Sequence, residues 1–140
     1  MAQSMKPSSG SKLSDSVAKL IELTQKSTIT WNALSPDSIP LTGQDYEQVE
    51  GAYEADYSKL RMHLYKRSYK SMQRRPRLFI SAFQDELYAV RVEEVILEHV
   101  DTLGNVLYRF PELDSLNNLF SAVQYASGGR DLIDALLQAT

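Results

Sequence analysis

The first periodic segment of the chain has the spacing of an amphipathic helix. Its packing residues recur every three or four positions: Val17, Leu20, Ile21 and Thr24. Ser14 or Asp15 is placed to cap this helix, which we expect to begin near Leu13 and to lay one face on a sheet. Residues 1–12 contain a proline, a glycine and four serines, so they predict a flexible N-terminal arm.

A change of pattern after the first helix predicts a short strand and then a loop. Residues 28–31 combine two threonines with Ile29 and Trp31, all of high strand propensity. We expect Trp31 to be buried between the first helix and the sheet, because large aromatic side chains mostly serve packing. Residues 33–45 contain two prolines and a glycine, which predict a long loop that is either functional or mobile.

In the middle of the chain the apolar period becomes two, which indicates β-strands. Residues 49–57 and 60–65 both alternate, and the two runs meet near Ser58 and Lys59. This junction is either a tight hairpin or a bulged, continuous strand. We favour the bulge or a bend, because neither glycine nor asparagine is available for a primed turn.

The second half of the predicted sheet is more interrupted. Strand character fades through residues 66–75, Pro76 ends it, and the polar residues 84–86 predict a turn. Further strands are predicted at residues 77–83, 87–92, 95–100 and 106–110. The Gly104–Asn105 pair before the last of these strands is the clearest hairpin signal in the chain.

Helical spacing returns near the C-terminus. Asp114 is a candidate cap, and a single apolar stripe follows: Leu116, Leu119, Phe120 and Val123. We expect Gly128 and Gly129 to stop this helix and a final short helix to begin near Asp131. The whole pattern predicts a single α+β domain over residues 13–140. It has an N-terminal helix, five or six mainly antiparallel strands, and one or two C-terminal helices packed on the sheet.

The amino-acid composition excludes several kinds of functional site and several classes of protein. The 140 residues include no cysteine, which excludes disulfides, thiol catalysis and cysteine-based metal sites. Apolar runs are too short to span a membrane, and the N-terminus lacks the apolar stretch of a signal peptide. We therefore expect a cytoplasmic protein that does not insert into a membrane.

The most informative stretch runs from Lys59 to Arg77, where eight positive charges occur without any Asp or Glu. The whole chain carries a net charge of −3, so the remaining residues carry −11. Such a basic element can attract anionic partners even on an acidic molecule. Eight residues are candidate contacts with a partner or with nucleic acid: Tyr65, Lys66, Arg67, Tyr69, Lys70, Arg74, Arg75 and Arg77.

Two interpretations of this basic stretch remain open. Tyr65 and Tyr69 interleave with cations, a combination that stacks bases and neutralises phosphates in single-strand binders. Yet no RNA-recognition or cold-shock signature occurs, and the pI near 5.4 is unusual for a dedicated nucleic-acid protein. A basic, solvated hairpin tip that discourages edge aggregation accounts for the same residues. We therefore expect any nucleic-acid binding to be weak.

The sequence predicts no catalytic, cofactor-binding or metal-binding residue. His63 and His99 lie in predicted strands, and the His99-x-Asp101 pair supplies fewer ligands than zinc requires. Adjacent carboxylates at 85–86 and 93–94 are more typical of solvated turns than of acid–base catalysis. No nucleophile elbow, glycine-rich phosphate loop, zincin or EF-hand motif occurs. An enzyme is therefore the least favoured class, although the sequence does not exclude one.

Three stretches together resemble the layout of a class of small single-domain bacterial proteins. They are LIELTQKSTITW, VDTLGNVLYRFP and LNNLFSAVQ, and tyrosine-rich strands lie between the first and the second. In those proteins a leading helix ends in a short Ile-x-Trp strand, a β-meander follows, and a hairpin ending in Phe-Pro feeds a C-terminal helix. The resemblance covers residues 14–137 and implies a fold and a bacterial origin. No established activity comes with it.

These observations leave three functional hypotheses. We favour a non-enzymatic protein-interaction module that presents loops and a sheet face to a protein partner. The alternative is a nucleic-acid-associated accessory protein that acts through the basic segment 59–77. The third hypothesis is a small enzyme whose site has no recognisable motif. The sequence leaves the identity of a partner and the oligomeric state open.

Overall fold

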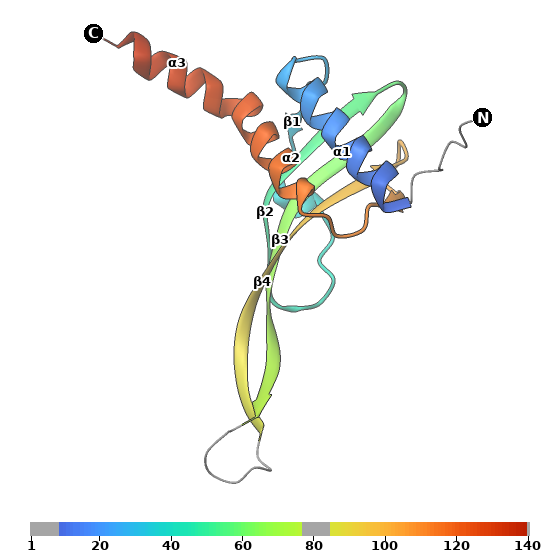
Figure 1. Cartoon of the computed structure of the whole chain (residues 1–140), viewed down its shortest axis with the longest axis vertical. Helices are drawn as coiled ribbons and strands as arrows, with labels where there is room; N and C mark the ends of the chain where they lie inside the picture. Colours follow the sequence, from blue (N-terminus) through green and yellow to red (C-terminus); the bar gives the residue numbers. More distant parts are fainter. Residues whose placement is uncertain (1–8, 77–84, 140) are drawn as a thin grey trace, which may run out of the picture.

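The chain folds into one open antiparallel sheet with helices on one face (Figure 1). A computed structural model describes residues 9–76 and 85–139. Within this part of the chain, five strands follow one another across the sheet: β1 (Asn32–Ala33), β2 (Asp45–Tyr57), β3 (Leu60–Pro76), β4 (Asp85–Val100) and β5 (Val106–Arg109). The helices are α1 (Ser9–Gln25), α2 (Ser115–Gln124) and α3 (Arg130–Gln138). The predicted α+β class is confirmed.

The principal core lies between the sheet and the two helices α1 and α2. Side chains from one face of β2, β3 and β4 meet the apolar stripes of both helices. The buried members are Val17, Ile29, Trp31, Ala55, Leu64, Leu97, Leu116, Leu119, Phe120 and Val123. The predicted stripe of each helix is confirmed, and so is the burial of Trp31.

A smaller core covers the opposite face of the sheet. The long loop between β1 and β2 contains a 3-10 turn (Pro36–Ser38) and buries Ile39 against Ala52, Tyr65 and Ile96. At the beginning of the loop, the N–H of Leu34 donates a 2.8 Å hydrogen bond to the carbonyl of Ala52. The loop that the sequence marks as functional or mobile therefore has a packing role.

The first helix begins earlier than the sequence pattern predicts. α1 starts at Ser9, so residues 9–12 are helical and do not belong to a flexible arm, while residues 1–8 lie outside the described chain. Serine and glycine are tolerated in a first turn, because the N–H groups there have no acceptor within the helix. Ser14 and Asp15 consequently lie inside the helix and are not its caps.

Residues 28–31 do not form the predicted strand. The buried side chains of Ile29 and Trp31 both turn into the principal core. The N–H of Ile29 bonds the carbonyl of Leu23 at 3.2 Å, so this segment closes the end of α1 instead of joining the sheet. The chain joins the sheet only at β1, which follows directly after Trp31 and pairs with β2. Packing on the helix has outweighed strand propensity here.

The connection between β2 and β3 is a tight two-residue turn, which corrects the expected bulge or bend. Ser58 and Lys59 have φ angles of 52° and 67°, as a type I′ turn requires at both positions. Tyr57 pairs with Leu60 directly across the turn. Each L-residue costs about 1–2 kcal/mol in this conformation, and the pairing of two long strands offsets that cost.

β3 and β4 are longer than predicted and extend beyond the body as a two-stranded arm (Figure 1). β3 runs through the predicted gap to Pro76, and β4 begins at Asp85 and continues without a break near Glu93. The strands stay in register as far as the pair Pro76–Asp85. Polar and basic side chains replace apolar alternation at residues 66–75, which hid this part of β3 from the pattern. The strand predicted at 77–83 lies outside the described residues.

The C-terminal helices form one continuous rod. α2 packs on the sheet as predicted, but Gly128 and Gly129 do not stop it, because a π-helical turn (Tyr125–Gly129) carries the chain into α3. Asp114 precedes α2 without forming a side-chain cap. α3 leaves the body (Figure 1) and has no buried residue. Of the one or two C-terminal helices expected on the sheet, α2 packs there and α3 does not.

Candidate interaction surfaces

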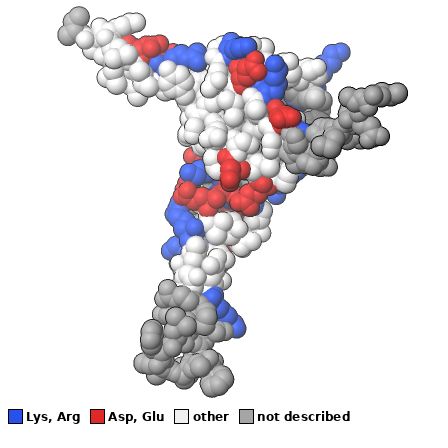
Figure 2. All heavy atoms as spheres, viewed as in Figure 1, with Lys and Arg blue, Asp and Glu red and all other residues white. Residues whose placement is uncertain are grey.

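The basic segment lies along β3, where the neighbouring strands supply acidic side chains. Lys66 Nζ is 3.3 Å from the carboxylate of Glu93 in β4. The guanidinium of Arg67 bonds Glu94 of β4 and lies 3.9 Å from Glu47 of β2. Acidic and basic atoms consequently gather side by side where the arm leaves the body (Figure 2). Strand pairing has neutralised charges that look like an unbroken basic run in the sequence.

The remaining candidate cations lie farther along β3. Lys70 Nζ is 4.3 Å from the centre of the Tyr46 ring, a cation–π contact. Arg74 is exposed on the arm and has a polar or ionic partner. Arg75 belongs to β3, but the structure does not describe its side chain. Arg77 lies outside the described residues. Among the described side chains, the structure places Lys66, Lys70 and Arg74 on one face of β3 and Arg67 on the other.

The two tyrosines predicted to stack on bases differ in their access to solvent. Tyr65 is only 3% exposed, and its hydroxyl accepts a 3.5 Å hydrogen bond from Arg109. Burial is the main cause that raises the pKa of Tyr65 to about 12, and the negative charge of Glu98 is the second cause. Tyr69 is half-buried, and the guanidinium carbon of Arg67 lies over its ring, 5.9 Å from the ring centre. Tyr65 is not accessible to a base, which corrects that part of the prediction.

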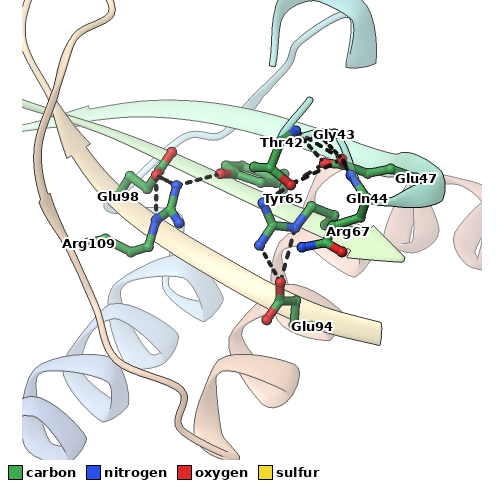
Figure 3. Close-up of polar contacts among 9 residues, drawn as sticks. All are labelled: Thr42, Gly43, Gln44, Glu47, Tyr65, Arg67, Glu94, Glu98 and Arg109. Carbon is green, nitrogen blue, oxygen red and sulfur yellow. Dashed lines mark hydrogen bonds and ion pairs between the residues drawn. The ribbon is translucent and has the colours of Figure 1, made fainter. Parts of the chain in front are cut away.

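Near Tyr65 and Arg67, the loop before β2 wraps around the carboxylate of Glu47 (Figure 3). The backbone N–H groups of Thr42, Gly43 and Gln44 donate hydrogen bonds of 2.9–3.1 Å to it. Burial would raise the pKa of Glu47, but these hydrogen bonds hold it below its ordinary value. The converging N–H groups are thus occupied by a side chain of this chain, and they fasten the loop to β2.

An ion pair between the buried Glu98 and the exposed Arg109 joins β4 and β5 (Figure 3). Arg109 Nε donates a 2.7 Å hydrogen bond to Glu98, which is directly opposite in the strand register. Burial would lower the pKa of Arg109, but the carboxylate of Glu98 raises it above its ordinary value. The guanidinium therefore satisfies the buried carboxylate of Glu98 and links the two strands.

The histidines are not brought together into a metal site. His63 Nε2 lies 2.8 Å from the carboxylate of Glu54 on β2. The carboxylate of Asp101, two residues after His99, accepts a 2.8 Å hydrogen bond from the N–H of Asn105. That bond fixes the predicted β4–β5 hairpin, which is confirmed. Within residues 9–76 and 85–139, no group of three or more His, Asp or Glu side chains is arranged to hold a metal ion.

An apolar pocket of about 350 Å³ lies beside the β2–β3 turn and β5. Its apolar lining consists of Tyr57, Leu60, Met62, Leu97, Tyr108 and Phe110, to which Glu98 and His99 add polar atoms. A catalytic site needs several convergent polar groups around the reacting atoms. The nearly uniform apolar lining gives this pocket no such arrangement.

One face of α3 is apolar and exposed. Its members recur at i, i+1, i+4 and i+5: Leu132, Ile133, Leu136 and Leu137. Leu136 is 65% exposed and Leu137 is 80% exposed. The stripe is visible in the sequence, but the glycine pair before it suggested a separate helix that folds back on the sheet. The continuous rod leaves this face without a packing partner among residues 9–76 and 85–139.

Comparison of the chain with protein-family models, curated proteins and solved structures finds no significant match. In the part of the chain that the structure describes, no helix has the length and apolar character needed to cross a membrane. The exposed face of α3 and the arm formed by β3 and β4 are therefore the geometric features on which a functional proposal can be built.

Proposed function

We propose that the chain is a non-enzymatic protein-interaction module that offers α3 to an apolar groove on a protein partner. The observation that carries this proposal is the exposed face formed by Leu132, Ile133, Leu136 and Leu137. None of these residues belongs to either core. An amphipathic helix that projects its apolar face into solvent is typical of helix-in-groove recognition.

The helix is prepared for binding by its connection to α2. Because α2 is anchored in the principal core, it supplies the helical nucleus from which α3 continues. Little conformational entropy is then lost when the partner binds. Full burial of a leucine or isoleucine contributes about 1.5–3 kcal/mol, so a groove that covers this face can reach micromolar affinity after the cost of association.

The charges of α3 indicate the character of the groove. Asp134 borders the apolar face beside Leu137, whereas Asp131 and Gln138 lie on the opposite side by helical spacing. Arg130, one turn before Asp134 on the same side of the helix, offsets this charge, so we expect a groove with an apolar floor and a polar rim. The proposed setting is the bacterial cytoplasm, which is supported by the sequence resemblance and by the composition.

Affinity capture from the native host, followed by binding measurements with each purified partner, tests this proposal. The baits are the full chain, Leu136→Asp, and the control Gln138→Asp, which adds the same charge on the polar face. We expect one partner to bind the full chain and the control equally, and Leu136→Asp at least about 100-fold more weakly. A partner that binds Leu136→Asp as tightly as the full chain contradicts the use of α3.

Nucleic-acid binding through residues 59–77 is the second candidate, supported by the spacing of Lys66, Lys70 and Arg74 along one strand. It is the weaker candidate, because Lys66 and Arg67 already pair with acids of the same chain. Titration with mixed single-stranded nucleic acid at two salt concentrations separates the candidates. Phosphate contacts give a log–log salt slope of about −0.7 each. Absence of binding at low salt removes this candidate.

A further inference from the structure

The outer edge of β4 is largely uncovered. One side of β4 pairs with β3 along its whole length, but on the other side β5 begins its pairing only at Glu98. The last bond on that outer side joins the N–H of Phe110 to the carbonyl of Leu97 at 2.9 Å. From Leu97 back toward the arm, β4 is an edge strand without a neighbour among the described residues.

The direction of the backbone groups on this edge follows from the Leu97 bond. In an antiparallel strand, the N–H and C=O groups of alternate residues point to the same side. Since the carbonyl of Leu97 points outward, the backbone groups of Ala89, Arg91, Glu93 and Val95 also point away from β3. A row of this kind is a template for another strand.

We propose that a second copy of this chain pairs with this edge, β4 against β4, in antiparallel orientation about a twofold axis through Val92. Residues 88–96 of each copy then pair. Arg91 of each copy lies opposite Glu93 of the other, on the same face of the joined sheet. Charge selects this register, because a shift by two residues places either Arg91 opposite Arg91 or Glu93 opposite Glu93.

The side chains on this edge suit such a pairing. Arg91 is 51% exposed and Glu93 is 46% exposed, and they are 3.3 Å apart on one copy. Their other contacts, Arg91 with Glu50 and Glu93 with Lys66, come from β2 and β3, so the outer side stays open. On the other face of the joined sheet, the half-buried Val92 meets its own counterpart.

A second copy also relieves the weakness of the arm. A two-stranded ribbon is marginally stable in water, whereas three or more strands support one another. Two copies joined through β4 convert each exposed ribbon into part of a continuous sheet. The pairing between the two copies ends before Leu97, because the carbonyl of Leu97 already accepts a hydrogen bond from the N–H of Phe110 in the same copy. This inference goes beyond the proposed function, because it uses β4 and leaves α3 free to bind another partner.

Sedimentation of the full chain over a range of concentrations tests the pairing. We expect a dimer for the full chain and a monomer for Ala89→Pro. Proline at residue 89 removes an outward N–H while the bonds between β3 and β4 remain. Ala89→Thr keeps the N–H and is the matched control, so it should remain a dimer. Circular dichroism checks that each variant is folded.

A charge exchange tests the register independently of proline. Arg91→Glu and Glu93→Arg should each weaken the dimer at least tenfold, and the double variant should restore it to within about threefold. The double variant does not restore the contacts with Glu50 and Lys66, so recovery cannot come from those bonds. A monomeric full chain, or a dimer that neither Ala89→Pro nor either single charge change weakens, overturns the proposal. A dimer lost only in Leu136→Asp assigns the contact to α3 and also overturns it.

Discussion

The indole Nε1 of Trp31 donates a 3.0 Å hydrogen bond to the hydroxyl of Thr24, and both side chains are buried. Thr24 in turn donates its hydroxyl proton to the carbonyl of Leu20 at 2.7 Å, one helical turn earlier. The bond fixes the segment after α1 against the helix and satisfies a buried donor that would otherwise be costly. The Trp31 ring is consequently held in the principal core.

Replacement of Thr24 by valine keeps the shape of the side chain and removes the acceptor. We expect Thr24→Val to lower the free energy of unfolding by about 1–3 kcal/mol, because the buried indole N–H is left unpaired. Urea denaturation followed by tryptophan fluorescence measures the change. Thr24→Ser, which keeps the hydroxyl, should lose clearly less than Thr24→Val. No loss in Thr24→Val would contradict a stabilising role for the hydrogen bond, and equal losses in the two variants would mean that the methyl group, absent only from Thr24→Ser, contributes as much as the bond.

The turn between β2 and β3 predicts a stabilising substitution. Lys59 has a φ of 67°, a value that costs an L-residue about 1–2 kcal/mol and costs glycine nothing. Lys59→Gly should raise the free energy of unfolding by about 0.5–1 kcal/mol after the greater entropy loss of glycine is included. Lys59→Ala is the control, since it removes the charge and keeps Cβ. A gain in the alanine variant as large as in the glycine variant would assign the effect to charge.

The raised pKa of Tyr65 predicts a loss of stability in alkali. The buried phenol is favoured in its neutral form, so its contribution is fully present below the unfolded pKa of about 10. It is lost as the pH rises through the folded pKa of about 12. The free energy of unfolding should therefore fall by up to about 2–3 kcal/mol over this interval.

Tyr65→Phe supplies the comparison for this alkaline loss. Phenylalanine cannot ionise, so this variant should lose less stability than the native chain between pH 10 and 12. In a spectroscopic titration of the tyrosines, the variant should lack the phenolate absorbance that the native chain gains near pH 12, where Tyr65 ionises. An unchanged alkaline profile in Tyr65→Phe would show that another group causes the loss.

Some elements follow from local pattern and others depend on contacts that a linear sequence does not display. The stripe of α2 and the Gly104–Asn105 hairpin carry period and turn chemistry in a few adjacent residues, and both predictions are confirmed. The β3 half of the arm was missed because residues 66–75 carry basic and polar side chains, and the counterions of Lys66 and Arg67 stand on β4. A run of like charges in one strand says nothing about its neighbours until the register is known.

The exposed face of α3 illustrates the same limit at the candidate site. Its four apolar residues are evident from helical spacing, and burial is the ordinary expectation for such a stripe. Its separation from the body depends on how the chain passes Gly128 and Gly129. Local propensity favours a stop at these glycines, whereas the π-helical turn continues the rod. The direction of a helix after such a junction is a tertiary property.

Removal of α3 tests whether this rod is independent of the cores. A chain that ends after Arg130 keeps the contact of its guanidinium with the Tyr125 ring, whose centre is 5.4 Å away. We expect its free energy of unfolding to stay within about 0.5 kcal/mol of the full chain, because the deleted side chains are exposed. Leu119→Ala, at a fully buried position of α2, should instead cost about 2–5 kcal/mol. If truncation costs more than about 1.5 kcal/mol in urea denaturation, α3 is part of the cooperative core and its apolar face is not available to a partner.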